Sequence, residues 1–187
     1  RHCIEARALG GKNIRTRSQS LINDDLLIDF PPDTYMHFLN CGIEGDKIKY
    51  LVVTHAHQDH LYTDDFLMRQ KGFANNVRVP ILKVLASKYT CDKINGVSNS
   101  VEAMEISPYE TVTLGDYRIT ALPARHMLEK DGAEPFIYII EGDKTILYAN
   151  DTGYFYEEVF DYIEKSGTKF DLVSMDCTNV NIAISDE

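Results

Sequence analysis

The sequence lacks any apolar run long enough to cross a membrane. A spanning helix needs about 18 consecutive apolar residues, and no stretch of the 187-residue chain approaches that length. The chain opens with Arg1, without the charged start and apolar stretch of a signal peptide. We therefore expect neither a membrane partner nor a secretory leader.

Cysteine is scarce, and its positions exclude a common zinc motif. The four cysteines are Cys3, Cys41, Cys91 and Cys177, and no two of them form a Cys-x-x-Cys pair. A zinc knuckle is therefore unsupported. Scattered thiols are typical of a reducing compartment, so we expect free, buried thiols and a cytoplasmic protein.

Basic residues are outnumbered. Lys and Arg total 19 against 29 Asp and Glu, which gives a formal net charge of -10. Affinity for long nucleic acids comes from Lys and Arg that neutralise phosphates, so a long nucleic acid is not an expected partner. The negative charge is compatible with divalent cations.

The alternation of apolar runs and turn signals predicts the fold class. Helices are expected at residues 31–41, 61–70, from 87 onward and at 154–165. Strands are expected at residues 20–22, 26–29, 48–54, 79–85, 101–106, 110–114, 117–122, 136–141, 145–149 and 170–176. This α+β pattern favours two sheets packed face to face with helices outside. We expect residues 1–187 to form a single domain.

The most informative stretch is residues 54–60, Thr-His-Ala-His-Gln-Asp-His, which directly follows an apolar run at 48–53. It holds half of the six histidines in the chain. A buried strand that ends in this many metal-ligand side chains predicts a metal site on a rigid support.

The spacing within this stretch assigns its side chains to two ions. Side chains alternate with a period of two in an extended backbone, so His55 and His57 point the same way and can reach one ion. Asp59 continues this parity and His60 turns with the next helix, so these two are offered to a second ion. Imidazoles suit zinc, and the carboxylate also allows manganese or iron.

Two further candidates stand where an expected strand becomes a loop. His126 follows the strand ending at residue 122, and Asp151 follows the strand ending at 149. From position alone, His126 is equally well a surface histidine, and Asp151 equally well the cap of the next helix. His37 lies on an expected helix, where a structural role is favoured over a catalytic one.

The order of these motifs resembles the metallo-β-lactamase superfamily over residues 20–178. The resemblance implies an αββα sandwich with a dinuclear site on one edge, and it implies a role for each candidate. His55, His57 and His126 would hold one metal, Asp59 and His60 the other, and Asp151 would bridge both. Asp29, at the end of an upstream strand, would steady the cluster from behind.

Within that family the sequence is more similar to the phosphodiesterase branch. Thioesterases and lactonases usually place a Gly-rich segment after the histidine cluster, and residues 61–66 are not Gly-rich. The branch includes the cyclic phosphodiesterase of phosphonate breakdown and the tRNA 3′-processing nucleases. The basic arm that the nucleases use for tRNA is absent, so a small phosphodiester is the expected substrate.

The sequence departs from the family in one respect. The family's final metal-ligand histidine lies near the C-terminus, and no histidine follows His126 here. Either the sequence omits terminal segments of the fold, which the missing initiator Met favours, or the second metal site is one ligand short.

The expected chemistry is two-metal hydrolysis, in which two ions activate a water for attack. Asp59 would orient the attacking group, and no general acid is assigned. Hydrolysis of a thioester or lactone at the same metals is the alternative enzyme activity. A non-catalytic metal-binding module with an incomplete second site is the alternative from another class. A small-molecule substrate is expected, and a homodimer stays open.

Overall fold

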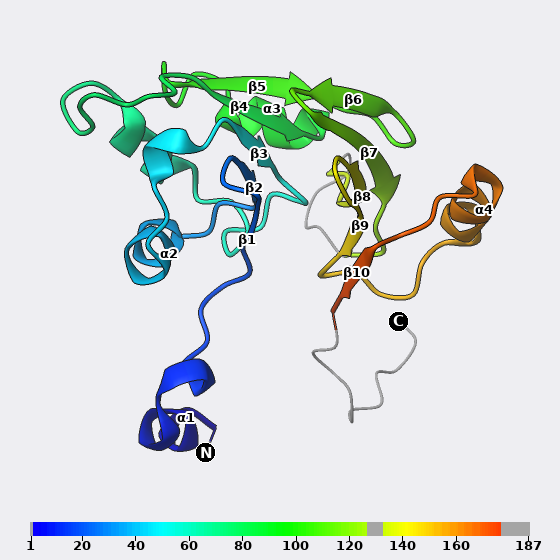
Figure 1. Cartoon of the computed structure of the whole chain (residues 1–187), viewed down its shortest axis with the longest axis horizontal. Helices are drawn as coiled ribbons and strands as arrows, with labels where there is room; N and C mark the ends of the chain where they lie inside the picture. Colours follow the sequence, from blue (N-terminus) through cyan, green and yellow to red (C-terminus); the bar gives the residue numbers. More distant parts are fainter. Residues whose placement is uncertain (1, 127–132, 177–187) are drawn as a thin grey trace.

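Two five-stranded sheets face each other in the computed structural model, which describes residues 2–126 and 133–176 (Figure 1). The first sheet has the order β1-β2-β3-β4-β5, and the second has the order β10-β9-β8-β7-β6. The strands of the first sheet are Ser20–Ile22, Leu26–Ile28, Tyr50–Val52, Leu82–Ala86 and Val101–Glu105. Those of the second, β6 to β10, are Thr111–Leu114, Tyr117–Pro123, Phe136–Glu141, Thr145–Ala149 and Leu172–Met175.

The two sheets differ in strand direction. In the first sheet only the β1–β2 hairpin is antiparallel, and β2 to β5 run parallel. In the second, β6 to β9 are antiparallel and β10 pairs with β9 in parallel. The candidate ligands follow the ends of β3, β7 and β9. The site therefore forms only where the mostly parallel first sheet packs against the mostly antiparallel second sheet.

Strand β2 has an entirely apolar sequence, Leu-Leu-Ile, because it is buried on both faces. Leu26 and Ile28 face the core between the sheets, where Ile119 and Tyr138 of the second sheet pack against this layer. Leu27 points to the opposite side and packs in a second core beneath the helices. A strand buried on both faces has no position left for a polar side chain.

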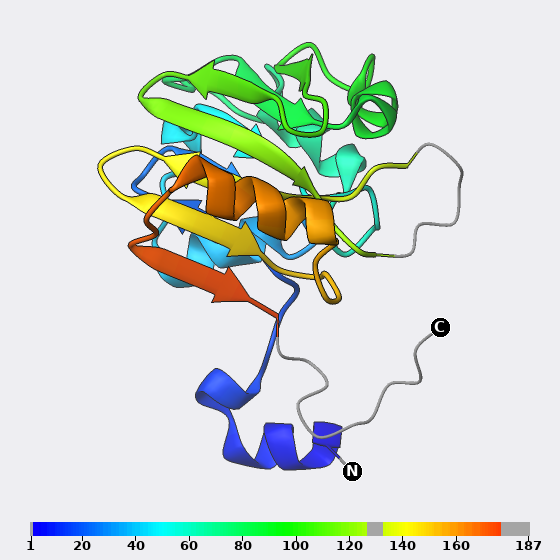
Figure 2. The same ribbon diagram turned by 90° about the vertical axis from the view of Figure 1, so that its right-hand side faces the viewer.

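Helices cover both outer faces, which completes the four expected layers (Figure 2). Helices α2 (Thr34–Cys41) and α3 (Lys88–Ile94) pack on the first sheet, and α4 (Glu157–Ser166) packs on the second through Val159. Helix α2 ends at Gly42, whose left-handed φ of 67° suits a residue without a Cβ. The described residues also form three short 3-10 helices, η1 (Gly11–Asn13), η2 (Gly45–Lys47) and η3 (Thr63–Arg69).

The first helix was not expected from the sequence. Helix α1 (His2–Leu9) lies apart from both sheets in the two ribbon views (Figures 1 and 2). Two of its apolar side chains, Ile4 and Leu9, are 66% and 72% exposed. The periodic burial that reveals an amphipathic helix is therefore missing here.

The helix expected at residues 61–70 is replaced by the shorter 3-10 helix η3. The backbone just before η3 pairs with another segment instead of forming a helical turn. The amide of Phe30 donates to the carbonyl of His60 at 2.7 Å, and the carbonyl of Phe30 accepts from the amide of Tyr62 at 2.8 Å. This parallel bridge at Leu61 keeps Leu61 and Tyr62 out of a helix. A helix cannot begin until the bridge ends.

The thiols fit the expectation only in part. Cys91 is buried, as expected, whereas Cys3 and Cys41 are exposed, so the expectation was wrong for these two. Cys177 lies outside the described residues. All three described cysteines are free, as expected.

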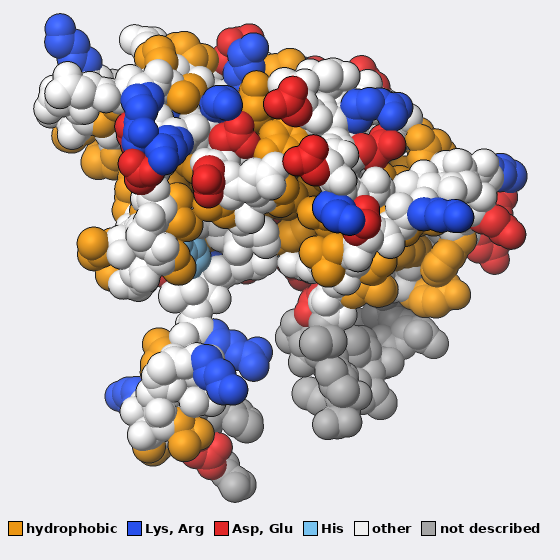
Figure 3. All heavy atoms as spheres, in the orientation of Figure 1, with side chains coloured by type: hydrophobic (Ala, Val, Ile, Leu, Met, Phe, Trp, Pro, Cys, Tyr) orange, Lys and Arg blue, Asp and Glu red, His pale blue; other side chains and the backbone are white. Residues whose placement is uncertain are grey.

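The surface carries charged side chains of both signs. Lys and Arg side chains are interspersed with Asp and Glu on the face in Figure 3, without a continuous basic surface on that face. No helix among the described residues is long and apolar enough to span a bilayer.

Candidate metal centre

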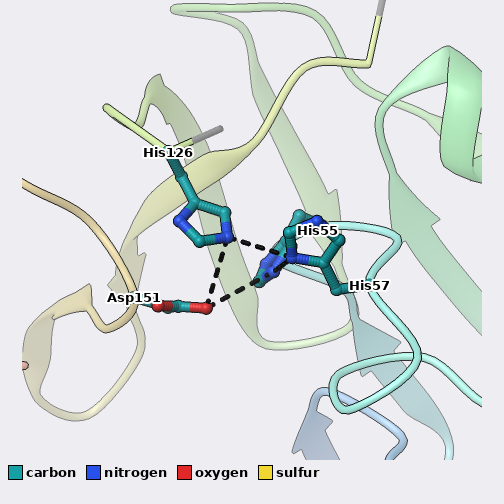
Figure 4. Close-up of side chains that lie close together, drawn as sticks. All are labelled: His55, His57, His126 and Asp151. Carbon is teal, nitrogen blue, oxygen red and sulfur yellow. Dashed lines mark hydrogen bonds and ion pairs between the residues drawn. The ribbon is translucent and has the colours of Figure 1, made fainter. Parts of the chain in front are cut away.

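The candidate ligands meet where β3, β7 and β9 end, and Figure 4 shows four of them: His55, His57, His126 and Asp151. The loop after β3 brings the histidine cluster, the segment after β7 brings His126, and the segment after β9 brings Asp151. Two hydrogen bonds join the sheets beside this point. Tyr138 Oη donates to the carbonyl of Val53 at 2.8 Å, and the amide of Phe136 donates to the carbonyl of Thr54 at 2.9 Å.

Three imidazoles form what we call the first ligand group: His55, His57 and His126. The Nδ1 atom of His57 lies 3.1 Å from Nε2 of His55 and 3.0 Å from Nε2 of His126. Together with an Asp151 oxygen, the ligand atoms of this group all lie within 4.8 Å of one another. Nitrogens that converge in this way can surround a single ion.

The carboxylate of Asp151 connects the first ligand group to His60. Its Oδ2 atom lies 3.4 Å from His55 Nε2, 3.5 Å from His126 Nε2 and 3.1 Å from His60 Nε2. Asp151 reaches this position from a left-handed backbone with φ of 55°. One oxygen in contact with imidazoles on both sides is the arrangement expected of a bridging ligand.

The second ligand group is Asp59 with His60. Their closest polar atoms are 3.9 Å apart, and the Asp59 side chain is 59% exposed while that of His60 is 6% exposed. The described cluster whose ligand atoms lie within 4.8 Å of one another does not include these two residues. This group is therefore less compactly assembled than the first.

Buried Asp29 anchors His60. Its carboxylate is fully buried and accepts a hydrogen bond from His60 Nδ1 at 2.7 Å. It also accepts from the amide of Thr54 at 2.8 Å and from its hydroxyl at 2.9 Å. Since Nδ1 of His60 donates to Asp29, Nε2 is the ring nitrogen that faces Asp151 and that a metal ion would contact.

The same carboxylate also sets the tautomer of His55. The Thr54 hydroxyl donates its only proton to Asp29, so its oxygen must accept at the 3.0 Å contact with His55 Nδ1. His55 therefore carries its proton on Nδ1 and turns Nε2 toward the site. Asp29 thus acts directly on one ligand group and through Thr54 on the other.

The surroundings of His55, His126 and Asp151 shift their pKa values in the direction that favours binding of a cation. Burial lowers the pKa of His55 to about 2, and burial also lowers the pKa of His126. The hydrogen bond with His60 lowers the pKa of Asp151 to about 2. At neutral pH these side chains are two neutral imidazoles and a carboxylate, the forms that ligate metals.

His60 behaves differently in the metal-free protein. Burial lowers its pKa, but the hydrogen bonds to Asp151 and Asp29 outweigh burial and raise the pKa to about 10. A proton on Nε2 of His60 therefore occupies the position that a cation would take. The donor set of imidazoles and carboxylates fits zinc, and also manganese or iron.

A pocket of about 400 Å³ opens beside Asp59, His60 and Asp151. Its other lining residues are Ser18, Asn150, Ser174, Met175 and Asp176. None of the described lining residues is a Lys or Arg. The Ser174 hydroxyl donates to Oδ1 of Asn150 at 3.0 Å, which fixes part of this polar wall.

A larger cavity of about 520 Å³ lies away from the candidate ligands. Its three basic residues are already paired: Lys47 contacts Glu44, Lys49 contacts Asp25 at 2.9 Å, and Arg78 contacts Asp46 at 2.6 Å. Size alone therefore does not make it the active site, and the donor cluster decides in favour of the smaller pocket.

The structure brings all six residues predicted as ligands, His55, His57, Asp59, His60, His126 and Asp151, to one place, with Asp29 behind them. Thr54 was missed as a tautomer-setting residue, although its place beside His55 was a usable signal. The pocket residues Ser18, Asn150 and Ser174 were also missed. They come from three separate segments, and no sequence pattern connects them.

A family model described as "Beta-lactamase superfamily domain" matches residues 26–183. Because this match covers most of the 187 residues, the chain belongs to that family. The predicted family resemblance and sandwich fold are confirmed. No curated protein matches the chain significantly.

Solved structures show the same fold. The metallo-β-lactamase fold protein YhfI from Bacillus subtilis aligns with a TM-score of 0.64 and 16% identity, covering 84% of this chain and 63% of its own. A diphosphatase from the PhnP family aligns with a TM-score of 0.63 and 20% identity, covering 86% of this chain and 60% of its own. The chain thus spans about 60% of the length of these structures. The fold is also found in CmlA, a diiron β-hydroxylase from Streptomyces venezuelae, with a TM-score of 0.50, 19% identity, and coverage of 71% of this chain and 26% of its own.

Proposed function

We propose that this protein is a hydrolase with a dinuclear metal site that cleaves a small phosphodiester. The observation that carries the proposal is the position of Asp151 Oδ2, which contacts His55, His126 and His60 at 3.1–3.5 Å. A carboxylate shared between two sets of imidazoles fits two neighbouring ions better than one.

The residues divide between the two ions as their contacts suggest. The first ligand group would hold one ion, Asp59 and His60 would hold the other, and Asp151 would touch both. When bound, two divalent ions supply positive charge for the phosphoryl oxygens and make a water molecule acidic near neutral pH. The exposed carboxylate of Asp59 would accept a hydrogen bond from that water and orient it.

The pocket favours a phosphodiester over a phosphomonoester. A monoester carries up to two negative charges and usually needs Lys or Arg beside the metals. The described lining includes three acidic residues, Asp59, Asp151 and Asp176, and no basic one. A diester has a single negative charge, which the two ions alone can neutralise.

The same lining disfavours the alternative of a thioester or lactone. An acyl group needs apolar walls for binding, and Met175 is the single apolar side chain among the described residues that line this pocket. A diphosphatase among the structural neighbours shows that the fold accommodates phosphoryl chemistry in that protein. For this chain, the polar lining of the pocket supports phosphoryl chemistry.

One observation supports the non-catalytic alternative. The second ligand group lies outside the compact cluster, and Asp59 is 3.9 Å from His60. A protein that holds only one ion would have this appearance too. The number of ions bound therefore separates the two functions.

The test combines metal analysis with hydrolysis assays on the same protein. Zinc- or manganese-loaded protein would be given bis(p-nitrophenyl) phosphate, p-nitrophenyl phosphate and a thioester, with and without chelator. We expect two ions per chain and metal-dependent cleavage of the diester in preference to the other two. Preference for the thioester would refute the phosphodiester assignment, and one ion without turnover would support the non-catalytic module.

A further inference from the structure

A line of hydrogen bonds runs from a surface threonine to the backbone behind the metal centre. Thr16 Oγ1 lies 2.7 Å from Nε2 of His37, and Nδ1 of His37 lies 2.7 Å from Oε1 of Gln19. Gln19 Nε2 then donates to the carbonyl of Asp29 at 2.9 Å. The side-chain hydrogen bonds of Thr16, His37 and Gln19 reach Asp29 and Thr34 but no candidate ligand, so their influence on the site passes through Asp29.

Asp29 needs this support because its backbone is in an unfavourable conformation. Its φ of 64° is in the left-handed region that residues with a Cβ usually avoid. Its amide donates to the carbonyl of Val52 at 2.8 Å, and its own carbonyl accepts from Gln19. These two bonds hold the peptide groups on either side of the Cα, so they also fix the direction of the buried carboxylate.

The hydrogen-bonding pattern leaves one orientation for the Gln19 amide. A carbonyl can only accept, so the atom facing Asp29 must be the nitrogen of Gln19. The second proton of that nitrogen goes to Thr34 Oγ1 at 3.0 Å, since the Thr34 hydroxyl donates to the carbonyl of Pro31 at 2.6 Å. Oε1 of Gln19 is left as an acceptor, and His37 must therefore carry a proton on Nδ1.

The segment that carries Gln19 is itself tied to the start of α2. The amide of Arg17 donates to Oδ2 of Asp33 at 2.9 Å, and the Arg17 guanidinium contacts the same oxygen at 3.1 Å. Gln19 is therefore held from its backbone side by Asp33 and from its amide by His37 and Thr34.

We propose that Gln19 is a positioning residue for the metal centre, oriented by His37 and acting through the left-handed backbone of Asp29. This inference rests on the proposed metal site, but not on the substrate or the reaction. Without the Gln19 amide, Asp29 loses the bond at its carbonyl and can turn toward ordinary φ values. The carboxylate would then move away from His60 and Thr54, and both ligand groups would lose their fixed imidazoles.

The test replaces Gln19 by leucine, which keeps the size of the side chain and removes the donor. Gln70→Leu is the matched control, because Gln70 is also half-buried and donates one hydrogen bond, to Ser98 at 3.1 Å, away from the site. Zinc affinity is measured by competition with a chromogenic chelator, and the cobalt-loaded protein is recorded in the visible range. Thermal unfolding of the metal-free proteins reports the purely structural effect.

We expect Gln19→Leu to weaken zinc binding by roughly 10- to 100-fold, as for other residues that support a ligand from behind. The cobalt spectrum should change in position or intensity, while Gln70→Leu leaves both properties as they are in the native protein. Equal zinc affinity and an unchanged cobalt spectrum in Gln19→Leu would overturn the proposal. An equal loss of zinc affinity in both variants would overturn it as well.

A pair of His37 variants tests the orienting step and covers the case in which Gln19→Leu fails to fold. His37→Asn keeps a donor near the place of Nδ1, whereas His37→Leu has none. We expect His37→Leu to bind zinc several-fold more weakly and His37→Asn to restore native affinity. Identical affinities in the two variants would contradict the role of His37. Absence of hydrolysis in otherwise zinc-binding protein would contradict the proposed function alone.

Discussion

The two ligand groups are built in opposite ways. The first takes His55 and His57 from the loop after β3 and His126 from the other sheet, and its nitrogens are already 3.0–3.1 Å apart. The second takes two adjacent residues from one loop, with His60 buried against Asp29 and Asp59 59% exposed. The first group therefore depends on the docking of two sheets, and the second on one buried carboxylate.

This difference shows where the protein fixes geometry in advance and where it leaves freedom. Imidazoles whose nitrogens already converge need little rearrangement to bind an ion. Asp59, whose side chain is 59% exposed, has room to move. Variants that damage one group and spare the other can test this division.

The largest effect is expected from His57→Ala. His57 Nδ1 contacts both other imidazoles of the first ligand group, so its removal leaves no compact set of three nitrogens. We predict that zinc affinity falls by more than roughly 100-fold, beyond the loss typical of residues behind the ligands. Hydrolysis should be lost with it. Inductively coupled plasma analysis after dialysis measures the metal, and a native zinc content in His57→Ala would refute the assignment of this group.

Asp151→Asn tests the connection between the groups. Asparagine also tolerates a left-handed backbone, so the chain at this position should keep its φ of 55°. The loss of charge should weaken zinc binding by roughly 10- to 100-fold and remove the second ion before the first. The control is Asp143→Asn in the exposed turn between β8 and β9. If isothermal titration still finds two ions of native affinity in Asp151→Asn, Asp151 does not bridge.

Thr54→Val separates the two routes by which Asp29 acts. The change removes the hydroxyl between Asp29 and His55 but leaves the 2.7 Å bond from His60 intact. An unpaired buried group costs about 1–3 kcal/mol, so the metal-free protein should lose about that much unfolding free energy. The ion of the first group should be affected more than that of the second. Exposed Thr113→Val should change neither quantity, and equal effects of the two variants would contradict the tautomer argument.

The smallest expected effect is a pH dependence of the free energy of unfolding, which bound zinc should remove. The folded pKa of His60 is raised from 6.5 to about 10 by its carboxylate partners. The folded state therefore holds this proton more tightly, and its stabilising contribution is complete below pH 6.5 and lost as pH rises toward 10. Bound zinc replaces the proton, so zinc-loaded protein should not show this loss. Urea unfolding at pH 6.5, 8 and 9.5 with and without zinc measures it, and parallel pH curves would count against the assignment of His60.

The sequence predicted the parts of the molecule that depend on local pattern. The hairpin of β1 and β2 and the β8–β9 pair were confirmed because turn residues stand between clear apolar runs. His126 and Asp151 were predicted as candidates because each follows the end of a strand, and the folded chain brings them beside His55 and His57.

Other parts depend on contacts between distant segments, and local pattern could not show them. Leu61 and Tyr62 stay out of a helix because this segment pairs with Phe30, and this overrides the helical pattern that follows. Gln19 looks like an ordinary polar residue, and only the folded chain places its amide against the carbonyl of Asp29. The unusual φ of Asp29 was equally hidden, since nothing in Leu-Leu-Ile-Asp signals a left-handed residue.

The hydrogen bonds that join the sheets beside the metal centre also bear on the order of folding. Val53 and Tyr138 are 85 residues apart in the chain, and His57 and His126 are 69 apart. Contacts between such distant residues form late, because the loop that they close must be ordered first. The ability to capture zinc is therefore expected to arise only when the sheets dock, after most secondary structure has formed. A zinc-sensitive dye followed during refolding would then time the last step of assembly, and capture that precedes the far-ultraviolet circular dichroism change would show the reverse order.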